Sequence, residues 1–324
     1  MRFWSKQIIG TVLFSSYFIV FSCTIRASDP IENSNRLNES KTVSTGNKEG
    51  ASILKIGLPK SLFRGIPSRA LQLANKPFLS LIESQTGLKG EVINTDDVDS
   101  TAKLIQDKKI QLGVFQGFEY ARIQKIYPKL RPLVIAAPTV DNSQVLVITR
   151  SDPCRKLSDI SGKKIGICKN AKDHVFLYWN KLLISELSSE KCKYQEVTDA
   201  KELLHDVFEK NFDVAVIDSA NWKTFKENNP GRAEQLHILA KSIEFPQPVI
   251  VYNDDGLGQE DLEKCRKGLI KAHQSAKARV MLQMIKVKGF NAIPENYDDL
   301  LKLTLENYPS EEIQRISLEK ESPK

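Results

Sequence analysis

Several short motifs that would identify a common enzyme class are missing from this sequence. The chain contains no P-loop, no GxGxxG fingerprint, no HExxH and no GxSxG, which argues against the common nucleotide-binding, zinc-protease and serine-hydrolase classes. Its five cysteines form no CxxC pair and no Cys/His ligand spacing, so we expect no metal site. No short repeat of fixed period occurs either, which argues against solenoids and propellers. The sequence therefore predicts neither a metal nor a cofactor.

The chain also has little excess charge once its N-terminus is set aside. It holds 47 Lys and Arg against 40 Asp and Glu, a net charge of +7. Residues 1–27 contribute three basic residues and no acid, which leaves 44 against 40, or +4, for the rest. Because the two signs are intermixed, this is an ordinary solvated surface, and we do not expect nucleic acid as a partner. A length of 324 residues with only 16 Gly and 14 Pro predicts about two folded domains.

The first 27 residues predict an export signal. A short basic stretch precedes an apolar run from Ile8 to Phe21, which has the length of a signal-peptide core and is short for a membrane span. Two processing routes are open: a lipoprotein signal that ends at residue 22 and lipidates Cys23, or ordinary cleavage after Ala27. Residues 28–50 are rich in Ser, Asn, Thr, Glu and Lys and predict a disordered tether. We expect a periplasmic or extracytoplasmic protein, lipid-anchored if Cys23 is modified.

Removal or lipidation of Cys23 leaves an even number of cysteines. Four cysteines allow three disulfide pairings, and the sequence does not choose among these and four buried thiols. The disulfide candidates are Cys154, Cys168, Cys192 and Cys265.

From Ile53 onward, apolar strands alternate with amphipathic helices, which is typical of α/β units. We expect two α/β lobes, with strand-like connections near 144–152 and 246–252 acting as a two-strand hinge. Lobe 1 is predicted to comprise residues 51–148 and 249–324, and lobe 2 residues 149–248. The expected strands lie at 53–58, 91–94, 111–115, 133–136, 144–149, 163–168, 194–197, 212–217, 237–240 and 249–252. Helices are expected at 69–84, 100–106, 173–187, 200–210 and 221–227, and from 259 to the end.

Polar and aromatic side chains follow several of the expected strands. Ligands of parallel α/β sheets sit beyond the carboxyl ends of the strands, where helix N-termini offer unpaired N–H groups to an anion. This rule selects the loops at 59–64, 116–120, 169–174 and 218–221. An alternative is that Ser, Asn and Asp in such loops serve only as helix caps. The candidate ligand-binding residues are Ser61, Phe63, Gln116, Phe118, Tyr120, Lys169, Asn170, His174, Asp218 and Ser219.

Cys168 is a candidate nucleophile as well as a disulfide candidate. It ends an expected strand just before a helix, with Lys169, Lys172 and His174 close by, conditions that lower the pKa of a thiol. No second histidine or acid is placed by the sequence to complete a catalytic set. We therefore do not expect an enzyme, and a thiol-dependent activity remains the lesser alternative.

Five segments in order resemble the phosphate/phosphite/phosphonate-type substrate-binding proteins of ABC transporters over about residues 53–310. They are 54–59, 111–120, 157–166, 212–218 and 289–300. The resemblance implies a type II periplasmic-binding fold whose lobes close on a ligand, and delivery to a membrane permease. It also implies that Tyr120 and Asp218 face the ligand. Phosphonate binders place hydroxyl residues at the start of the first helix of the second lobe, where this chain has Lys169-Asn-Ala-Lys-Asp-His174.

Taken together, these features predict an exported, monomeric solute-binding protein. Its ligand is expected to be a small anion, phosphonate- or phosphate-like, held between the lobes for an ABC importer. Lys169 and Lys172 can neutralise such an anion without the hydroxyl residues. A ligand-sensing or scaffold protein that uses the same cleft to regulate a membrane partner is the alternative.

Overall fold

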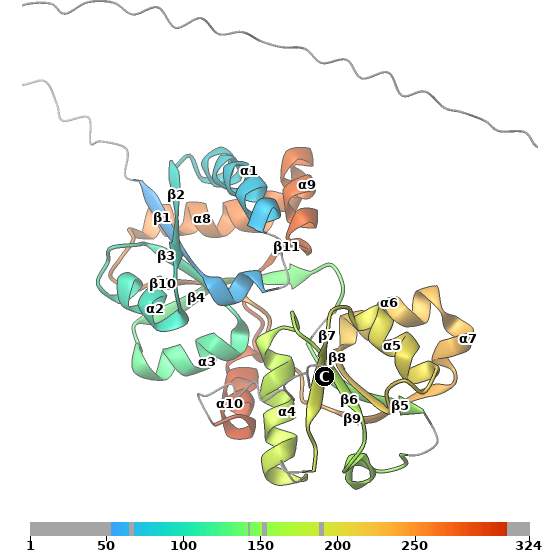
Figure 1. Cartoon of the computed structure of the whole chain (residues 1–324). Coiled ribbons are helices and arrows are strands. Elements are labelled where there is room, and N and C mark those ends of the chain that lie inside the picture. Colours follow the sequence, from blue (N-terminus) through green and yellow to red (C-terminus); the bar gives the residue numbers. More distant parts are fainter. Residues whose placement is uncertain (1–52, 65–67, 142, 151–153, 188–190, 310–324) are drawn as a thin grey trace, which may run out of the picture. The chain divides into compact units, whose positions relative to one another are not determined.

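A computed structural model of the chain describes residues 53–64, 68–141, 143–150, 154–187 and 191–309, with side chains of the first helix described from residue 76. The expected export signal, Cys23 and the tether at 28–50 lie outside the described residues. The described part of the chain contains two β-sheets, each covered by helices on both faces (Figure 1). No helix in it is both long and apolar enough to span a membrane.

The first sheet has six strands in the order β11-β4-β10-β3-β1-β2. Strand β1 pairs in parallel with β2 and β3, whereas β10 and β11 run antiparallel to their neighbours. The strands are β1 (Leu54–Pro59), β2 (Gly90–Thr95), β3 (Leu112–Phe115), β4 (Leu130–Pro138), β10 (Val249–Asn253) and β11 (Val287–Asn291).

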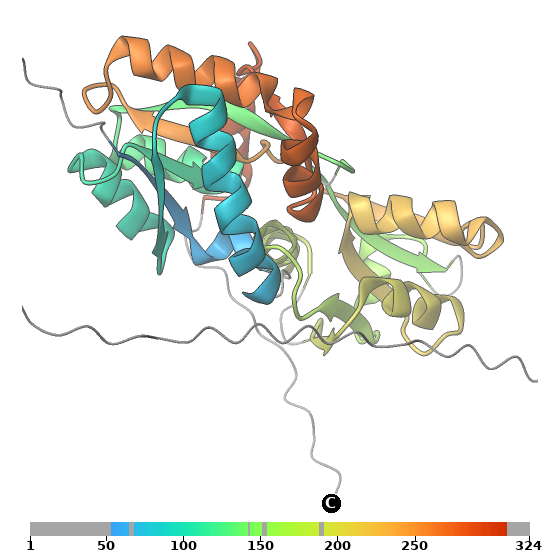
Figure 2. The ribbon, with the colours of Figure 1, turned by 90° about the horizontal axis from the view of Figure 1, so that it is seen from above.

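Helices cover both faces of this sheet. One face carries a core shared by α1 (Ser68–Thr86), α8 (Gln259–Lys271) and α9 (Ala276–Met284), which lie together in Figures 1 and 2. The opposite face packs against α2 (Val98–Gln106), α3 (Gly117–Ile126) and α10 (Tyr297–Asn307). The short helices η1 (Lys60–Phe63) and η3 (Ala272–Gln274) complete this first lobe.

The second sheet has five strands in the order β7-β6-β8-β5-β9. Its strands are β5 (Val145–Arg150), β6 (Ile165–Cys168), β7 (Tyr194–Val197), β8 (Val214–Asp218) and β9 (Leu236–Lys241). Helix α4 (Asp173–Ser185) covers one face; α5 (Ala200–Phe208), α6 (Ser219–Asn228) and α7 (Pro230–Ala233) cover the other, and η2 (Leu157–Ile160) precedes β6.

Alternation along β8 shows how one strand serves both cores of the second lobe. Val214 and Val216 pack in the core beneath α4, whereas Ala215 and Ile217 pack in the core beneath α5 and α6. Side chains of a strand point to opposite faces in turn, so a strand buried on both faces reads as one continuous apolar run. The last residue, Asp218, is the first polar one, and it stands at the carboxyl end of the sheet.

The chain crosses between the lobes earlier than the sequence predicts. Strand β5 was expected in lobe 1 up to residue 148, but it pairs with β8 and β9 of the second sheet. The first crossing therefore falls between β4 and β5, and the return lies between β9 and β10. A period-2 apolar pattern identifies a strand but not the sheet it joins, because only pairing partners decide that.

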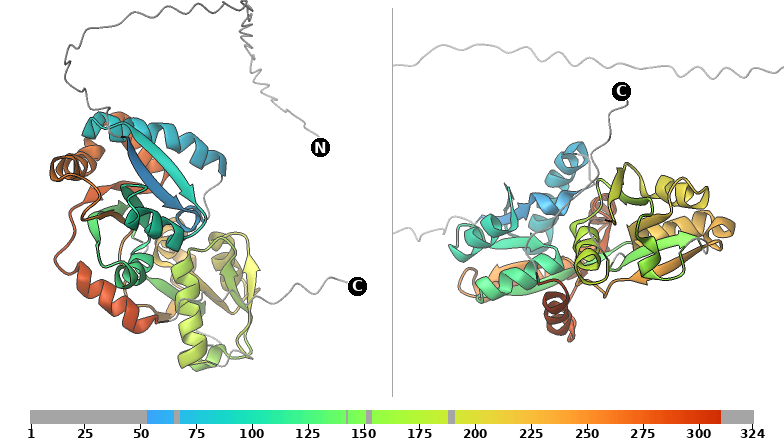
Figure 3. Two further views of the ribbon diagram at one scale, coloured as in Figure 1. Left: turned by 90° about the vertical axis from the view of Figure 1, so that its left-hand side faces the viewer. Right: turned by 60° about the horizontal axis from the view of Figure 1, so that its bottom comes forward.

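The C-terminal region also differs from the continuous helical segment that the sequence predicts. Strand β11 interrupts it and pairs with β4. Beyond it, helix α10 lies beside α4 of the second lobe (Figure 3). At its end, the Lys181 Nζ donates to Asn307 Oδ1 at 2.7 Å and the Tyr308 ring stacks on Phe245. The end of α10 therefore ties the two lobes together beside the crossings.

Candidate functional site

A cavity of about 690 Å³ is lined by residues of both lobes. Its wall includes Leu58, Val114, Cys168 and Asp218, which lie at or near the carboxyl ends of β1, β3, β6 and β8. Because β1 and β3, and likewise β6 and β8, are parallel pairs, these ends meet on one edge of each sheet. The cavity thus lies where parallel α/β sheets bind their ligands.

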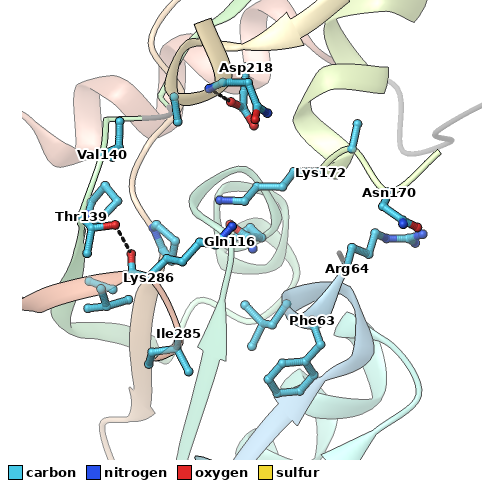
Figure 4. A pocket seen from close by; sticks show the side chains of 18 of the residues that line it. Phe63, Arg64, Gln116, Thr139, Val140, Asn170, Lys172, Asp218, Ile285 and Lys286 are labelled. Atoms are coloured by element: carbon cyan, nitrogen blue, oxygen red, sulfur yellow. Dashed lines mark hydrogen bonds between the residues drawn. The ribbon is translucent and has the colours of Figure 1, made fainter. Parts of the chain in front are cut away.

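Two ammonium groups, one from each lobe, point into this cavity (Figure 4). Lys172 is the N-cap residue of α4 and makes no side-chain cap hydrogen bond. Lys286 comes from the turn between α9 and β11, where it adopts a left-handed φ of 57°. Burial lowers the pKa of Lys172, Asp218 opposes this, and the positive charge of Lys286 lowers it further. The two like charges are therefore held close enough to repel each other.

Asp218 supplies the negative charge on the second lobe's wall. It is buried at the end of β8 and caps α6, with one carboxylate oxygen accepting from the Asn221 N–H at 2.8 Å. Asn221 and Thr224, one and two turns into α6, also line the cavity. This wall therefore combines a carboxylate with amide and hydroxyl groups.

An ion pair joins the lobes at the rim of the cavity. The Arg64 Nε of η1's C-terminal end lies 2.9 Å from Asp173 Oδ2, in the first turn of α4. Arg64 is 43% exposed, whereas Asp173 is 6% exposed.

Glu119 is a buried carboxyl near this ion pair. It accepts from the Gln116 N–H at 2.8 Å, and burial raises the pKa of its carboxyl to about 7.

Four of the residues predicted from the sequence line the cavity, and six do not. The four are Phe63, Gln116, Asn170 and Asp218. Three of the six are next to a lining residue in the chain but do not line the cavity themselves: Ser61, Lys169 and Ser219. The other three are buried in the lobes: Phe118, Tyr120 and His174.

Helix α3, which the sequence does not predict, and the predicted helix α4 direct these three side chains into the protein interior. Helix α3 starts at Gly117, so Tyr120 lies a full turn inside it and donates its hydroxyl to the Leu130 carbonyl at 3.1 Å. Phe118 packs edge-on against Phe245 in the second lobe's core. The His174 ring also packs on Phe245, and burial lowers its pKa to about 3.

The cavity contains polar residues that the sequence-based candidate set omits. Thr139 and Thr198 directly follow β4 and β7, so the same strand-end rule finds them when it is applied to every strand. Arg64 and Lys172 stand in loops that the rule selected. Lys286 has no such signal, because it precedes a strand that the sequence pattern does not show.

The environment of Cys168 differs from the expected one. Its side chain lines the cavity, but burial, together with the nearby charges of Asp199 and Asp218, raises the pKa of the thiol to about 12. The sequence predicted a lowered pKa from nearby lysines, and this prediction was wrong. In the structure, Cys154, Cys168, Cys192 and Cys265 are all present as thiols. Among the described residues, no three His, Cys, Asp or Glu side chains gather as a metal site.

Comparisons with known proteins agree with this architecture. The sequence model described as "ABC transporter, phosphonate, periplasmic substrate-binding protein" matches residues 66–297. No curated protein matches the chain with significance.

Several solved structures share the fold at low sequence identity. XAC2383 from Xanthomonas citri, solved with ATP, superposes with a TM-score of 0.58 and 16% identity over 80% of this chain and 97% of its own. PhnD1 from Prochlorococcus marinus, in complex with methylphosphonate, has a TM-score of 0.52 and 13% identity, over 79% of this chain and 98% of its own. A binding protein component of an ABC phosphonate transporter from Pseudomonas aeruginosa has a TM-score of 0.51 and 16% identity, over 78% of this chain and 85% of its own. The two α/β lobes form a type II periplasmic-binding fold.

Proposed function

Because the chain belongs to the family of periplasmic substrate-binding proteins of phosphonate ABC transporters, we propose that it captures a small oxyanion between its lobes and delivers it to a membrane permease. The proposed ligand class is phosphonate- or phosphate-like. The protein acts as an exported monomer, held at the membrane if Cys23 is lipidated, and it binds its ligand without chemical change.

The observation that carries this proposal is the pair of lysines in the cavity. Lys172 and Lys286 enter from opposite lobes, and the positive charge of Lys286 contributes to the lowered pKa of Lys172. An anion between them offsets the repulsion between the two charges and replaces the water that Lys172 loses by partial burial. Charge-assisted hydrogen bonds to an oxyanion are among the stronger polar contacts in proteins.

Other groups at the cavity support the same ligand class. Helix α4 begins at the cavity with Lys172 as its N-cap residue, and the N-terminus of a helix favours an anion. Gln116, Asn170 and Thr139 add neutral polar contacts at the wall. Asp218 suits a ligand that also carries a donor group, such as a hydroxyl or an amine. Two structural neighbours were solved with ligands that bear phosphoryl oxygens, ATP and methylphosphonate, and this class is therefore the first to test.

Isothermal titration of the lysine variants tests the proposal. We expect Lys172→Met and Lys286→Met each to weaken phosphonate or phosphate binding at least about tenfold, because each removes a charge-assisted contact. Lys169→Met removes an exposed lysine three residues from Lys172 and outside the cavity lining, so it should change the affinity little.

Thermal unfolding of the same variants separates loss of binding from loss of folding. The lowered pKa of Lys172 means that its charge costs the folded protein free energy, so Lys172→Met should unfold at the same or a higher temperature. Unchanged affinity in both cavity variants would contradict the proposal, as would binding of neutral sugars in preference to every anion.

A further inference from the structure

The two walls of the cavity differ in chemistry. The second lobe contributes most of the polar and charged lining groups, among them Lys172, Asp218 and Asn221. The first lobe contributes a large apolar surface from three separate elements: η1, α1, and the segment from α9 to β11. We call this surface the apolar wall; its residues are Leu62, Phe63, Phe78, Met281, Ile285 and Phe290.

The apolar wall is the part of the first lobe's hydrophobic core that borders the cavity. All six of its residues belong to or pack against the core cluster beneath α1, α8 and α9. Met281 and Phe290 are 1% and 6% exposed, but the other four are only partly buried. Side chains of a closed core are normally covered on all sides. Here all six residues line the cavity, so the apolar area that they leave uncovered borders it.

The lysines stand beside this wall. In Figure 4 Phe63 and Ile285 lie on one side of the Lys172 and Lys286 side chains, and Asp218 lies on the other. An anion held by the lysines can therefore direct a substituent onto the apolar wall. A cavity of about 690 Å³ also has room for more than a bare oxyanion, because cavities of this size hold ligands of many heavy atoms.

We propose that the natural ligand is an amphipathic anion, with an alkyl or aryl group of several carbons packed on the apolar wall. The oxyanion head lies between Lys172 and Lys286, and the apolar group is buried against Leu62, Phe63, Phe78, Ile285 and their neighbours. This inference rests on the proposed function and narrows its ligand class: alkyl- or arylphosphonates and similar acids bind in preference to inorganic phosphate and methylphosphonate.

A homologous series of phosphonates tests the inference. We expect the dissociation constant, measured by titration calorimetry, to fall about fourfold for each buried methylene from methyl- to propyl- to hexylphosphonate. Hexylphosphonate should therefore bind more than tenfold tighter than methylphosphonate. Equal affinities along the series would overturn the inference and leave the proposed function standing.

A neutral ligand separates the two proposals. Dimethyl hexylphosphonate keeps the chain but has no charge, so it should bind much more weakly than hexylphosphonate. If it binds equally well, the anion proposal fails and the apolar wall alone determines binding. If neither phosphate nor any phosphonate binds, both proposals fail together.

A substitution in the apolar wall provides the second test. Ile285→Asn should lower the ratio of hexyl- to methylphosphonate affinity severalfold, because it places an amide against the alkyl chain. The matched control is Ile184→Asn, at a position on α4 that is 82% exposed and outside the cavity lining, which should leave this ratio unchanged. An equal ratio in the wild type and Ile285→Asn would contradict the inference.

Discussion

At the scale of single residues, burial affects the pKa of Lys172 and Cys168 more than the charged residues next to them in the sequence do. Lys172 and Lys169 are three residues apart, yet of the two only Lys172 lines the cavity, where burial lowers the pKa of Lys172. Cys168 follows the same principle, since burial outweighs the nearby lysines and raises its pKa. Local sequence can thus identify a loop near the ligand, but the solvation of each group depends on segments distant in the chain.

Glu119 allows a pH-dependent test at this scale. Burial raises its pKa from 4.5 to about 7, so the folded protein binds this proton more tightly than the unfolded chain. Its favourable contribution is complete below pH 4.5 and is lost as the pH rises through 7. Glu119→Gln should therefore be more stable than the wild type at pH 8, by on the order of 2 kcal/mol, and similar to it near pH 4.5. Urea unfolding at both pH values measures this difference.

Glu227→Gln, an exposed substitution on α6, is the control for the Glu119 variant. It should show no gain of stability at pH 8. A Glu119 variant that is less stable than the wild type at pH 8 would show that the ionised carboxylate, through its bond to the Gln116 N–H, is favourable instead.

At the scale of elements, segments with a clear apolar pattern are predictable whatever their length, and segments without one are not. The helix expected at 69–84 spans Ser68–Thr86 and continues through Pro77, and the strand at 194–197 is observed with those bounds. Helix α3 was not predicted, although a capping box between Gln116 and Glu119 marks its start. Strand β11 was also missed, because its five residues include Lys288 and Gly289 and it forms only through pairing with β4.

The start of α3 depends on a glycine that lets another segment approach. A Cβ at Gly117 would lie 2.2 Å from the Pro246 carbonyl oxygen, in the connection that returns from β9 to β10. Gly117→Ala must displace this connection, and we expect it to lower the melting temperature by at least about 4 °C. Gly231→Ala, in α7, meets nothing within 4 Å and should leave the melting temperature nearly unchanged. Equal melting temperatures for the two variants would refute the packing argument.

For the molecule as a whole, the proposed function depends on how the two lobes, between which the chain crosses twice, move relative to each other. Residues of both lobes line the cavity, so a movement of one lobe changes its volume and contacts. The Arg64–Asp173 pair and the end of α10 both join the lobes. A hinge protein needs such contacts to be weak, because ligand binding must be able to shift the balance between open and closed forms.

Small-angle X-ray scattering tests whether the lobes move on ligand binding and whether the Arg64–Asp173 pair joins them. We expect saturating ligand to reduce the radius of gyration, and Arg64→Gln to increase that of the ligand-free protein by removing a contact between the lobes. Lys129→Gln removes a comparable exposed pair with Asp255 inside the first lobe and should leave the radius unchanged. An identical radius for the wild type and Arg64→Gln would show that this ion pair does not hold the lobes together.

The sequence by itself determined the α/β architecture, the two-lobed organisation and the family, because these follow from apolar periodicity and short local motifs. The sequence also predicted four of the cavity residues, because each lies in a loop predicted to follow a strand at the edge where the cavity lies: Phe63, Gln116, Asn170 and Asp218. Only the tertiary structure decided which sheet β5 joins, why Tyr120 and His174 are buried, and that Lys286 meets Lys172. The physical reason is the same in each case: pairing, burial and charge contacts join residues far apart in the chain, and the local pattern carries no information about those partners.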